Sequence, residues 1–268
     1  MTRKPFVAGQ FYPAGRDELR ETIAGMIDPA ASPKRAVALV APHAGYVYSG
    51  PVAGAVFSSA KIPGTCVILG PAHREIDSLF AVQARGSWAT PLGESPVDEA
   101  LASRILSACP LAEENDQAHR GEHSLEVELP FIQYFRADAA IVPISVSYLA
   151  RYDELETLGR ALARAIRDER PETLIVASTD MSHYVSQKAA EKKDMMAIRK
   201  VLDLDPAGLF KTVTSEKISM CGFQPTTAAL VAALGLGASK AELVRYQTSG
   251  DASGDYSQVV GYAGIRIS

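Results

Sequence analysis

The sequence predicts an α/β fold made of one domain, with a mainly parallel central sheet and helices on both of its faces. Short apolar runs alternate along the chain with longer amphipathic stretches, which is typical of strands that helices cover on both sides. The 268 residues are 47% hydrophobic, so the chain can bury a substantial core. No repeat, low-complexity tract or flexible linker marks a boundary, and we therefore expect residues 1–268 to form a single domain.

The individual elements follow from the local spacing of apolar residues. Strands are expected where the apolar runs are short, at Ala36–Val40, Cys66–Leu69, Ala140–Ile144, Leu174–Ala177, Leu243–Tyr246 and Val259–Ile267. Amphipathic spacing predicts helices at Arg16–Ile27, Pro51–Ser59, Asp98–Ala108, Ser124–Phe135, Asp153–Arg167, Ala189–Leu202 and Pro225–Leu234. Ser49 ahead of Pro51, and Pro225 followed by threonines, are signals for the start of a helix.

The composition argues against several classes of partner. The net charge of -4 comes without a block of like charges, so we expect no nucleic-acid partner and no binding to an anionic membrane surface. Pro5, Gly9 and Pro13 interrupt the apolar residues of the N-terminus, which is unlike a signal peptide. No later segment has the apolar length needed to cross a bilayer. A cytoplasmic protein is therefore expected.

Histidines follow several of the predicted strands. His43 comes directly after the first strand in VALVAPHAGYVYSG, His73 after the next in VILGPAHRE, and Asp180 and His183 after a third in LIVASTDMSHY. The carboxyl ends of parallel strands meet at one edge of a sheet, where ligands usually bind, so we expect these side chains to converge. Neutral imidazoles suit zinc, iron or copper. A single histidine here is more often a loop residue bonded to backbone carbonyls, but three placed alike favour a site.

The cysteines differ in their surroundings. Three cysteines without CxxC spacing argue against both a disulfide framework and a zinc ribbon. Cys66 lies in a predicted buried strand and Cys109 ends a helix, so both are interpreted as packing residues. Cys221 lies in the loop before the helix at Pro225, where the helix dipole favours a thiolate. The spacing alone fits a functional cysteine and a packing cysteine equally well.

The segment HRGEHSLEVELPF is the densest polar cluster. His119, Glu122 and His123 spell the H-x-x-E-H zinc-peptidase signature, but Gly121 weakens a helix there and Arg120 adds positive charge beside the ligands. Beyond this point the spacing becomes helical, which lets Glu126 lie nearer the pocket. Glu122 or His123 is then a supporting group or proton carrier. The alternative is a polar helix entrance with solvated carboxylates.

Glycine-rich segments do not indicate a cofactor. TSGDASGD gathers Asp251, Ser253 and Asp255 but lacks the spacing and distal glutamate of an EF-hand, so a tight loop between strands is expected. The glycines of HAGYVYSGP match neither the dinucleotide nor the Walker fingerprint. No nucleotide cofactor is expected.

Longer stretches of the chain resemble the Memo family. These stretches are PFVAGQFYPA, APHAGYVYSGPVA, LGPAHR, TPLGE, EHSLEVELPF, IVPI, ASTDMSHY, MCGFQP, YQTSGD and VVGYAGI, in the order typical of that family. Together they span nearly the whole chain and are much more specific than any short motif. The chain is thus similar to Memo proteins of the AmmeMemoRadiSam protein B type, whose fold resembles that of the class III extradiol dioxygenases.

The resemblance implies a metal site. Class III extradiol dioxygenases bind non-haem iron(II) through two histidines and a glutamate. Carried over residue by residue, PHAGY implies His43 as a ligand, GPAH implies His73, and MCG implies that Cys221 stands where the dioxygenases have their carboxylate. A thiolate in that place changes the softness and redox behaviour of the metal, which puts ring cleavage in doubt.

The resemblance also implies which residues act on a substrate. His183 matches the acid/base histidine of the dioxygenases, Asp180 lies beside it, and His123 matches a further pocket histidine. Bacterial and archaeal relatives are often grouped with a radical-SAM protein, which implies such a pathway partner for this chain.

The sequence leaves three functions open. The first is an oxidoreductase in which the metal ligands hold iron or copper and His183 moves protons. The second is a hydrolase in which they hold zinc and His183 or Glu126 activates water. The third is a module that binds a peptide or small molecule without turnover, in a pocket lined by aromatic residues such as Tyr46, Tyr48, Trp88 and Tyr184.

Overall fold

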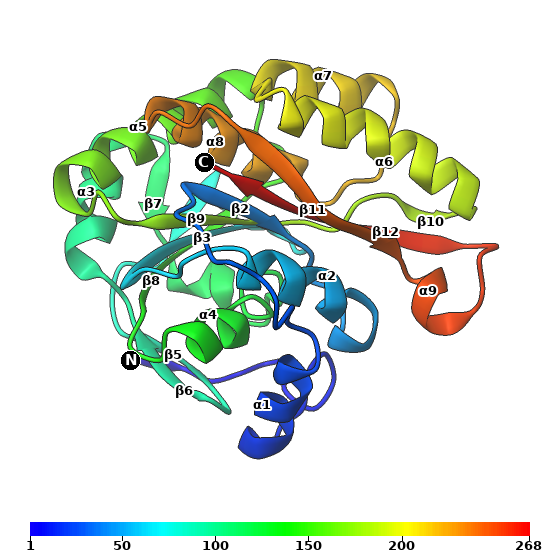
Figure 1. Ribbon diagram of the computed structural model, residues 1–268. Coiled ribbons are helices and arrows are strands. Elements are labelled where there is room, and N and C mark those ends of the chain that lie inside the picture. Colours follow the sequence, from blue (N-terminus) through cyan, green and yellow to red (C-terminus); the bar gives the residue numbers. More distant parts are fainter.

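A nine-stranded sheet runs through the centre of the protein, which we describe from a computed structural model of residues 1–268 (Figure 1). The strands lie in the order β10, β12, β2, β9, β3, β8, β4, β7, and β11 pairs with β12 outside this path. Their bounds are β2 Ala38–Ala41, β3 Thr65–Pro71, β4 Phe80–Val82, β7 Ala112–Glu114, β8 Ala140–Val146, β9 Leu174–Ser178, β10 His183–Val185, β11 Ala241–Thr248 and β12 Val259–Ile267.

The middle of the sheet is parallel, and an antiparallel strand pairs with it on each side. β2 and β3 both pair in parallel with β9, and β3 pairs in parallel with β8. β12 then pairs antiparallel with β2, and β4 antiparallel with β8. The predicted α/β fold is confirmed, with a parallel centre inside a mixed sheet. The parallel strands are buried along almost their whole length, which explains why they show as unbroken apolar runs in the sequence.

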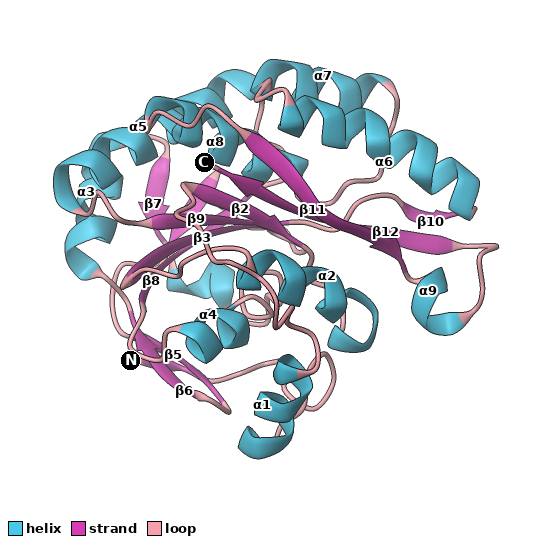
Figure 2. Ribbon diagram, viewed as in Figure 1, coloured by secondary structure: helices cyan, strands magenta, loops and turns pink.

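Helices cover both faces of the sheet (Figure 2). Side chains alternate between the faces, so Val67 and Leu69 of β3 pack into one hydrophobic core while Cys66 and Ile68 pack into the other. Helices α3, α5, α6, α7 and α8 contribute to the first core, and α1, α2 and α4 to the second. Their bounds are α1 Arg16–Ala24, α2 Tyr46–Ser58, α3 Glu99–Ala108, α4 Leu129–Phe135, α5 Tyr152–Glu169, α6 Gln187–Leu202, α7 Pro206–Ser215 and α8 Phe223–Gly235.

Several elements differ from the sequence prediction. The helix expected from Pro51 begins at Tyr46, five residues earlier, and the helix expected from Ser124 begins only at Leu129. The acidic glycine segment forms the short helix α9 (Gly250–Ser253) instead of a plain loop. The prediction also missed α7, the short strands of the flank, and a separate small sheet made of β1 (Thr2–Arg3), β5 (Ser87–Thr90) and β6 (Gly93–Pro96). Short strands lack the apolar period on which such predictions depend. No helix of the protein combines the length and the apolar character needed to span a bilayer.

Candidate metal centre

The candidate site lies where the parallel strands of the sheet end. β2, β9 and β3 are neighbours, and His43, Asp180 and His73 each follow the last residue of one of them by two positions. Parallel strands bring these ends to the same edge, so the expected convergence is observed. A cavity of about 620 Å³ opens there, lined by all the histidines of the chain except His119, and by Asp180.

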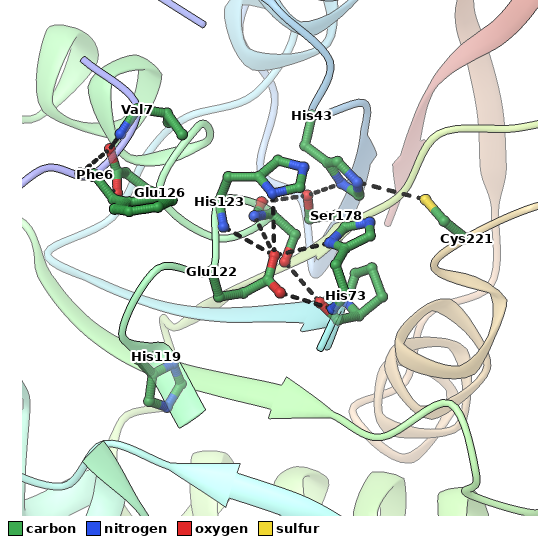
Figure 3. Close-up of polar contacts among 12 residues, drawn as sticks. Phe6, Val7, His43, His73, His119, Glu122, His123, Glu126, Ser178 and Cys221 are labelled. Atoms are coloured by element: carbon green, nitrogen blue, oxygen red, sulfur yellow. Dashed lines mark hydrogen bonds and ion pairs between the residues drawn. The ribbon is translucent and has the colours of Figure 1, made fainter. Parts of the chain in front are cut away.

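Three imidazoles cluster on the wall of this cavity. One ligand nitrogen from each of His43, His73 and His123 lies within 4.8 Å of the other two (Figure 3). The rings of His73 and His123 stack with their centroids 4.4 Å apart, and His43 stands nearly perpendicular to both. Burial, aided by the neighbouring imidazoles of His73 and His123, lowers the pKa of His43 well below its ordinary value. His43 is therefore neutral at physiological pH, as a metal ligand must be.

Glu122 holds two of the three histidines in place. Its Oε1 lies 2.8 Å from Nδ1 of His73 and accepts hydrogen bonds from the backbone N–H groups of His123 and Ser124, and its Oε2 accepts one from the backbone N–H of His73. Burial opposes the charge of this carboxylate, but the contacts with His73 and the backbone outweigh it and lower the pKa of Glu122. With Nδ1 engaged in this way, Nε2 of His73 remains free for a metal.

His43 is oriented from the neighbouring strand. Its Nδ1 lies 2.8 Å from Oγ of Ser178, the last residue of β9, and its backbone N–H donates to Oδ1 of Asp180 at 2.8 Å. Ser178 is itself fully buried. Nε2 of His43 consequently points away from the strand and toward the sulfur of Cys221.

Cys221 lies beside His43 at the start of α8. Its Sγ is 3.4 Å from Nε2 of His43 and accepts a hydrogen bond from the backbone N–H of Asp180 at 3.2 Å. Burial of the thiol, followed by the nearby charge of Asp180, raises the pKa of Cys221. The cysteine is therefore a thiol in the metal-free protein, contrary to the thiolate that its place before a helix favours, because desolvation exceeds the effect of the helix dipole. Cys66 and Cys109 are buried in the core, as expected.

His183 and Asp180 also line this cavity, Asp180 just after β9 and His183 at the start of β10. Nδ1 of His183 contacts the backbone carbonyl of Ser219 at 2.8 Å, so this nitrogen carries a proton, and Nε2 is the atom with a free lone pair in the neutral ring. Burial raises the pKa of Asp180 to about 6. His183 and Tyr184 belong to β10, which has a bulge against β12. Tyr184 has a left-handed φ of 55°, is 73% exposed and lines the cavity.

Aromatic rings form much of the remaining wall. Phe11, Tyr48, Tyr184 and Tyr262 line the cavity, and Phe11 packs against His123 with ring centroids 4.8 Å apart. Among the lining residues there is no lysine or arginine. Of the aromatic residues that the sequence suggested, Tyr48 and Tyr184 line the cavity, whereas Trp88 and Tyr46 are buried in the core.

The expectation that Glu126 faces the cavity is wrong. Its buried carboxylate accepts hydrogen bonds from the backbone N–H groups of Phe6 and Val7 (Figure 3). It also accepts one from the hydroxyl of Tyr12 and forms an ion pair with Arg3 at 2.6 Å. The prediction assumed a helix from Ser124, which would turn Glu126 toward the pocket. The chain becomes helical only at Leu129, so this spacing does not apply to Glu126.

His119 likewise lies outside the cluster. It is fully buried, with its ring 5.6 Å from that of Trp88, so His119 and His123 do not act together in the manner of an H-x-x-E-H site.

The donor set fits a transition-metal ion. Donors at about 2.1 Å from a tetrahedral metal lie roughly 3.4 Å apart, and a nitrogen and a sulfur ligand roughly 3.6 Å apart. The histidine nitrogens lie within 4.8 Å of one another and would have to move closer to reach this spacing, whereas Cys221 already stands at this distance from His43. Buried partners hold Nδ1 of both His43 and His73, which leaves the Nε2 atoms as the donors.

Comparison with known proteins identifies a family for the chain. A family model described as "Memo-like protein" matches residues 3–266. The chain belongs to the Memo family. A MEMO1 family protein of Methanopyrus kandleri is 41% identical over 99% of this chain and 98% of its own length. MEMO1 family proteins of Pyrobaculum aerophilum and Aquifex aeolicus are 41% and 39% identical, each over 98% of both chains.

A solved structure shows the same fold at much lower similarity. The crystal structure of an uncharacterised protein from Escherichia coli K12 matches with a TM-score of 0.52 and 15% identity, covering 85% of this Memo family chain and 99% of that one. At this identity the likeness concerns the fold alone.

Sequence reasoning missed several residues of the site, including Phe11, Tyr262 and Ser178. Ser178 gave no signal, because a serine at the end of an apolar run is ordinary in any α/β protein. Its importance depends on the pairing of β2 with β9, which places it opposite Ala41 and next to His43.

Proposed function

We propose that this Memo family protein is a metal-dependent oxidoreductase that binds iron or copper through His43, His73 and one further donor, and that acts on a small organic molecule in the adjoining cavity. The observation that carries the proposal is the cluster of three imidazoles at an open cavity, with Nδ1 of His43 and His73 already occupied by buried partners. Histidines arranged in this way are typical of metal sites that leave coordination positions free for a ligand.

Two residues compete for the third donor position. His123 belongs to the cluster of ligand nitrogens, whereas Cys221 contacts His43 from its other side. Sulfur together with imidazole suits iron, copper or zinc, and a third imidazole suits the same ions with a harder donor set. The family resemblance implies Cys221 as the third donor, whereas the cluster of ligand nitrogens contains His123 instead.

His183 is the group best placed to move a proton. Its Nδ1 is held by the carbonyl of Ser219, so the free Nε2 can accept a proton from a substrate bound in the cavity and return it later. A bound iron or copper would supply the change of oxidation state that side chains lack. Phe11, Tyr48, Tyr184 and Tyr262 provide flat apolar surface on which a planar organic molecule can rest.

A zinc-dependent hydrolase is the second candidate. The observation in its favour is the all-imidazole cluster, because three histidines with an open fourth position are typical of zinc sites that activate water. His183 would then take the proton of the attacking water. Glu126 has no part in this alternative, since the N-terminal segment occupies its carboxylate.

Metal binding by variants tests the proposal. Protein purified without oxygen is expected to carry about one iron or copper ion per chain, and His73→Ala is expected to lose most of it. His119→Gln is the matched control, because this histidine lies outside the cluster. Retention of full metal content by His43→Ala and His73→Ala would contradict the site.

Cobalt(II) distinguishes the candidate donors and functions. If Cys221 is a ligand, the cobalt protein shows a sulfur-to-metal charge-transfer band that Cys221→Ser abolishes. If His123 is the third donor, the band is missing and His123→Ala loses the metal. Metal-dependent oxygen consumption with small phenols supports the oxidoreductase, whereas ester hydrolysis by the zinc form without oxygen uptake would replace it with the hydrolase.

A further inference from the structure

Three buried glutamates in one short segment have very different partners. Glu122, Glu126 and Glu128 are each no more than 2% exposed. Backbone N–H groups and His73 surround Glu122, and Arg3, two backbone N–H groups and Tyr12 surround Glu126. Glu128 has no cation and no backbone donor, and its one contact is Oε1 to Oγ of Ser178 at 2.8 Å. Its other oxygen, Oε2, has no partner at all.

The hydrogen bonds around Ser178 allow only one arrangement of protons. Oγ of Ser178 lies 2.7 Å from the backbone oxygen of Ser124, 2.8 Å from Oε1 of Glu128 and 2.8 Å from Nδ1 of His43. A hydroxyl group donates one proton and accepts two hydrogen bonds. The carbonyl of Ser124 can only accept, so the hydroxyl proton goes there. His43 and Glu128 must therefore each bring a proton of their own.

We propose that Glu128 is a neutral carboxylic acid, and that its O–H donates to Ser178 and so positions the serine oxygen as the acceptor for the Nδ1–H of His43. Glu128 is then a positioning residue, two hydrogen bonds away from the Nε2 atom that faces Cys221 and the cavity. In this arrangement each of the three hydrogen bonds at Ser178 Oγ has one donor and one acceptor, and the tautomer of His43 is defined.

Burial supports the neutral form independently of this count. A carboxylate enclosed with one oxygen unpaired and no positive neighbour is far more costly than a carboxylic acid in the same place. Burial accordingly raises the pKa of Glu128 well above its ordinary value, the hydrogen bond with Ser178 opposes that change, and the charge of Asp180 adds to it.

The two oriented histidines thus receive unlike support. Glu122, an anion, holds His73, whereas a hydroxyl backed by an uncharged acid holds His43. An anionic partner makes an imidazole a stronger donor, and a neutral partner only fixes its direction. Of the two glutamates that support these histidines, only Glu122 therefore carries a negative charge.

Infrared spectroscopy of the metal-free protein tests the protonation state directly. At about pH 8, roughly two units above the pKa of about 6 of Asp180, a protonated carboxyl band is expected that shifts when glutamate is labelled with ¹³C at its carboxyl carbon. The label excludes Asp194, a buried aspartate whose pKa burial raises as well. Absence of a glutamate band would overturn the proposal without any variant having to fold, and without bearing on metal binding.

The same substitution at two glutamates provides the matched comparison. In Glu128→Gln the amide N–H replaces the acid O–H toward Ser178, so the infrared band disappears while the variant folds and His43 keeps its Nδ1–H tautomer, observable by ¹⁵N NMR. Glu122→Gln keeps the band but replaces an oxygen that accepts several hydrogen bonds. A band that persists in Glu128→Gln would contradict the assignment.

Cobalt affinity measures what the positioning achieves, and this arm rests on the proposed metal site. Glu128→Leu removes the donor to Ser178 and is expected to weaken cobalt(II) binding about tenfold, with Glu128→Gln restoring most of the affinity. Equal affinities in both variants would show that Glu128 does not position His43. If the wild-type protein does not bind cobalt(II) at all, the proposed metal site is refuted, but the infrared evidence on the protonation of Glu128 is unaffected.

Discussion

His119 and His123 stand four positions apart and have opposite surroundings. His123 faces the cavity beside His73, whereas His119 is sealed in the core beside Trp88. Neither ring nitrogen of His119 makes a hydrogen bond of normal geometry. The nearby backbone of Ala81 slightly favours the protonated form of the ring, which raises its pKa. Burial and then the charge of Arg3 lower the pKa of His119 to about 3.

Acid is therefore expected to destabilise the fold through His119. The unfolded chain binds a proton at this residue below its ordinary pKa of 6.5, and the folded chain does so only near 3. The stabilising difference is present above pH 6.5 and is lost as the pH falls toward 3, by up to about 1.4 kcal/mol for each pH unit. His119→Phe removes this titration while keeping an aromatic ring against Trp88.

Urea unfolding measured from neutral to acid pH tests this expectation. The free energy of unfolding of His119→Phe is expected to fall less steeply with acid than that of the wild-type protein, because every other titrating group is shared. Parallel curves for the two proteins would show that folded and unfolded protein protonate His119 over the same pH range.

Among the elements, the N-terminal segment depends most on a single side chain. Glu126 binds Arg3, Phe6, Val7 and Tyr12, and this segment carries Phe11 to the cavity wall beside His123. The carboxylate of Glu126 therefore influences the site indirectly, because it holds the segment that places Phe11 at the cavity. Local helical spacing cannot reveal such a role.

Glu126→Gln is expected to loosen this segment. The neutral amide leaves the guanidinium of Arg3, which is 9% exposed, without its counter-charge, and breaking one side of a buried pair costs about 3–5 kcal/mol. Backbone amides of residues 3–12 are then expected to exchange with deuterium at least about tenfold faster, with α5 as an internal reference. Unchanged protection of this segment would mean that other contacts hold it.

For the whole molecule, the most extensive contact between covering helices is that of α5 with α8. A Cβ atom at Gly159 would lie 2.5 Å from Cβ of Val231 and 2.6 Å from the backbone oxygen of Ala228. α8 begins just after Cys221 and packs on the same core as α5. The spacing of the two helices therefore supports the position of the loop that carries the thiol.

Gly159→Val is expected to lower the free energy of unfolding by about 1–3 kcal/mol, because a side chain there forces the two helices apart. Arg164→Val on the exposed face of α5 controls for the helix propensity of valine. Chemical denaturation measures both variants. Equal stability of Gly159→Val and the control would show that the two helices can separate at little cost.

The local pattern of the sequence was enough to predict the buried strands, most of the helices and the histidines at the strand ends. A strand covered on both faces has to be an apolar run, and the residue after it has to lie at the edge of the sheet. His43, His73, Asp180 and His183 were found in this way, and their shared cavity follows from the parallel order of β2, β9 and β3.

Only the tertiary structure decided the partners of these groups. His43 contacts Ser178 across 135 positions of the chain, and Glu126 pairs with Arg3 across 123. Residues that are close together in one segment consequently have different surroundings. His123 lines the cavity, whereas His119 is buried in the core. Glu126 binds the N-terminal segment, and Glu128 contacts Ser178. The physical reason is that a hydrogen bond or a desolvated charge depends on what lies within about 3 Å, and in this fold those atoms come from strands and loops far apart in the sequence.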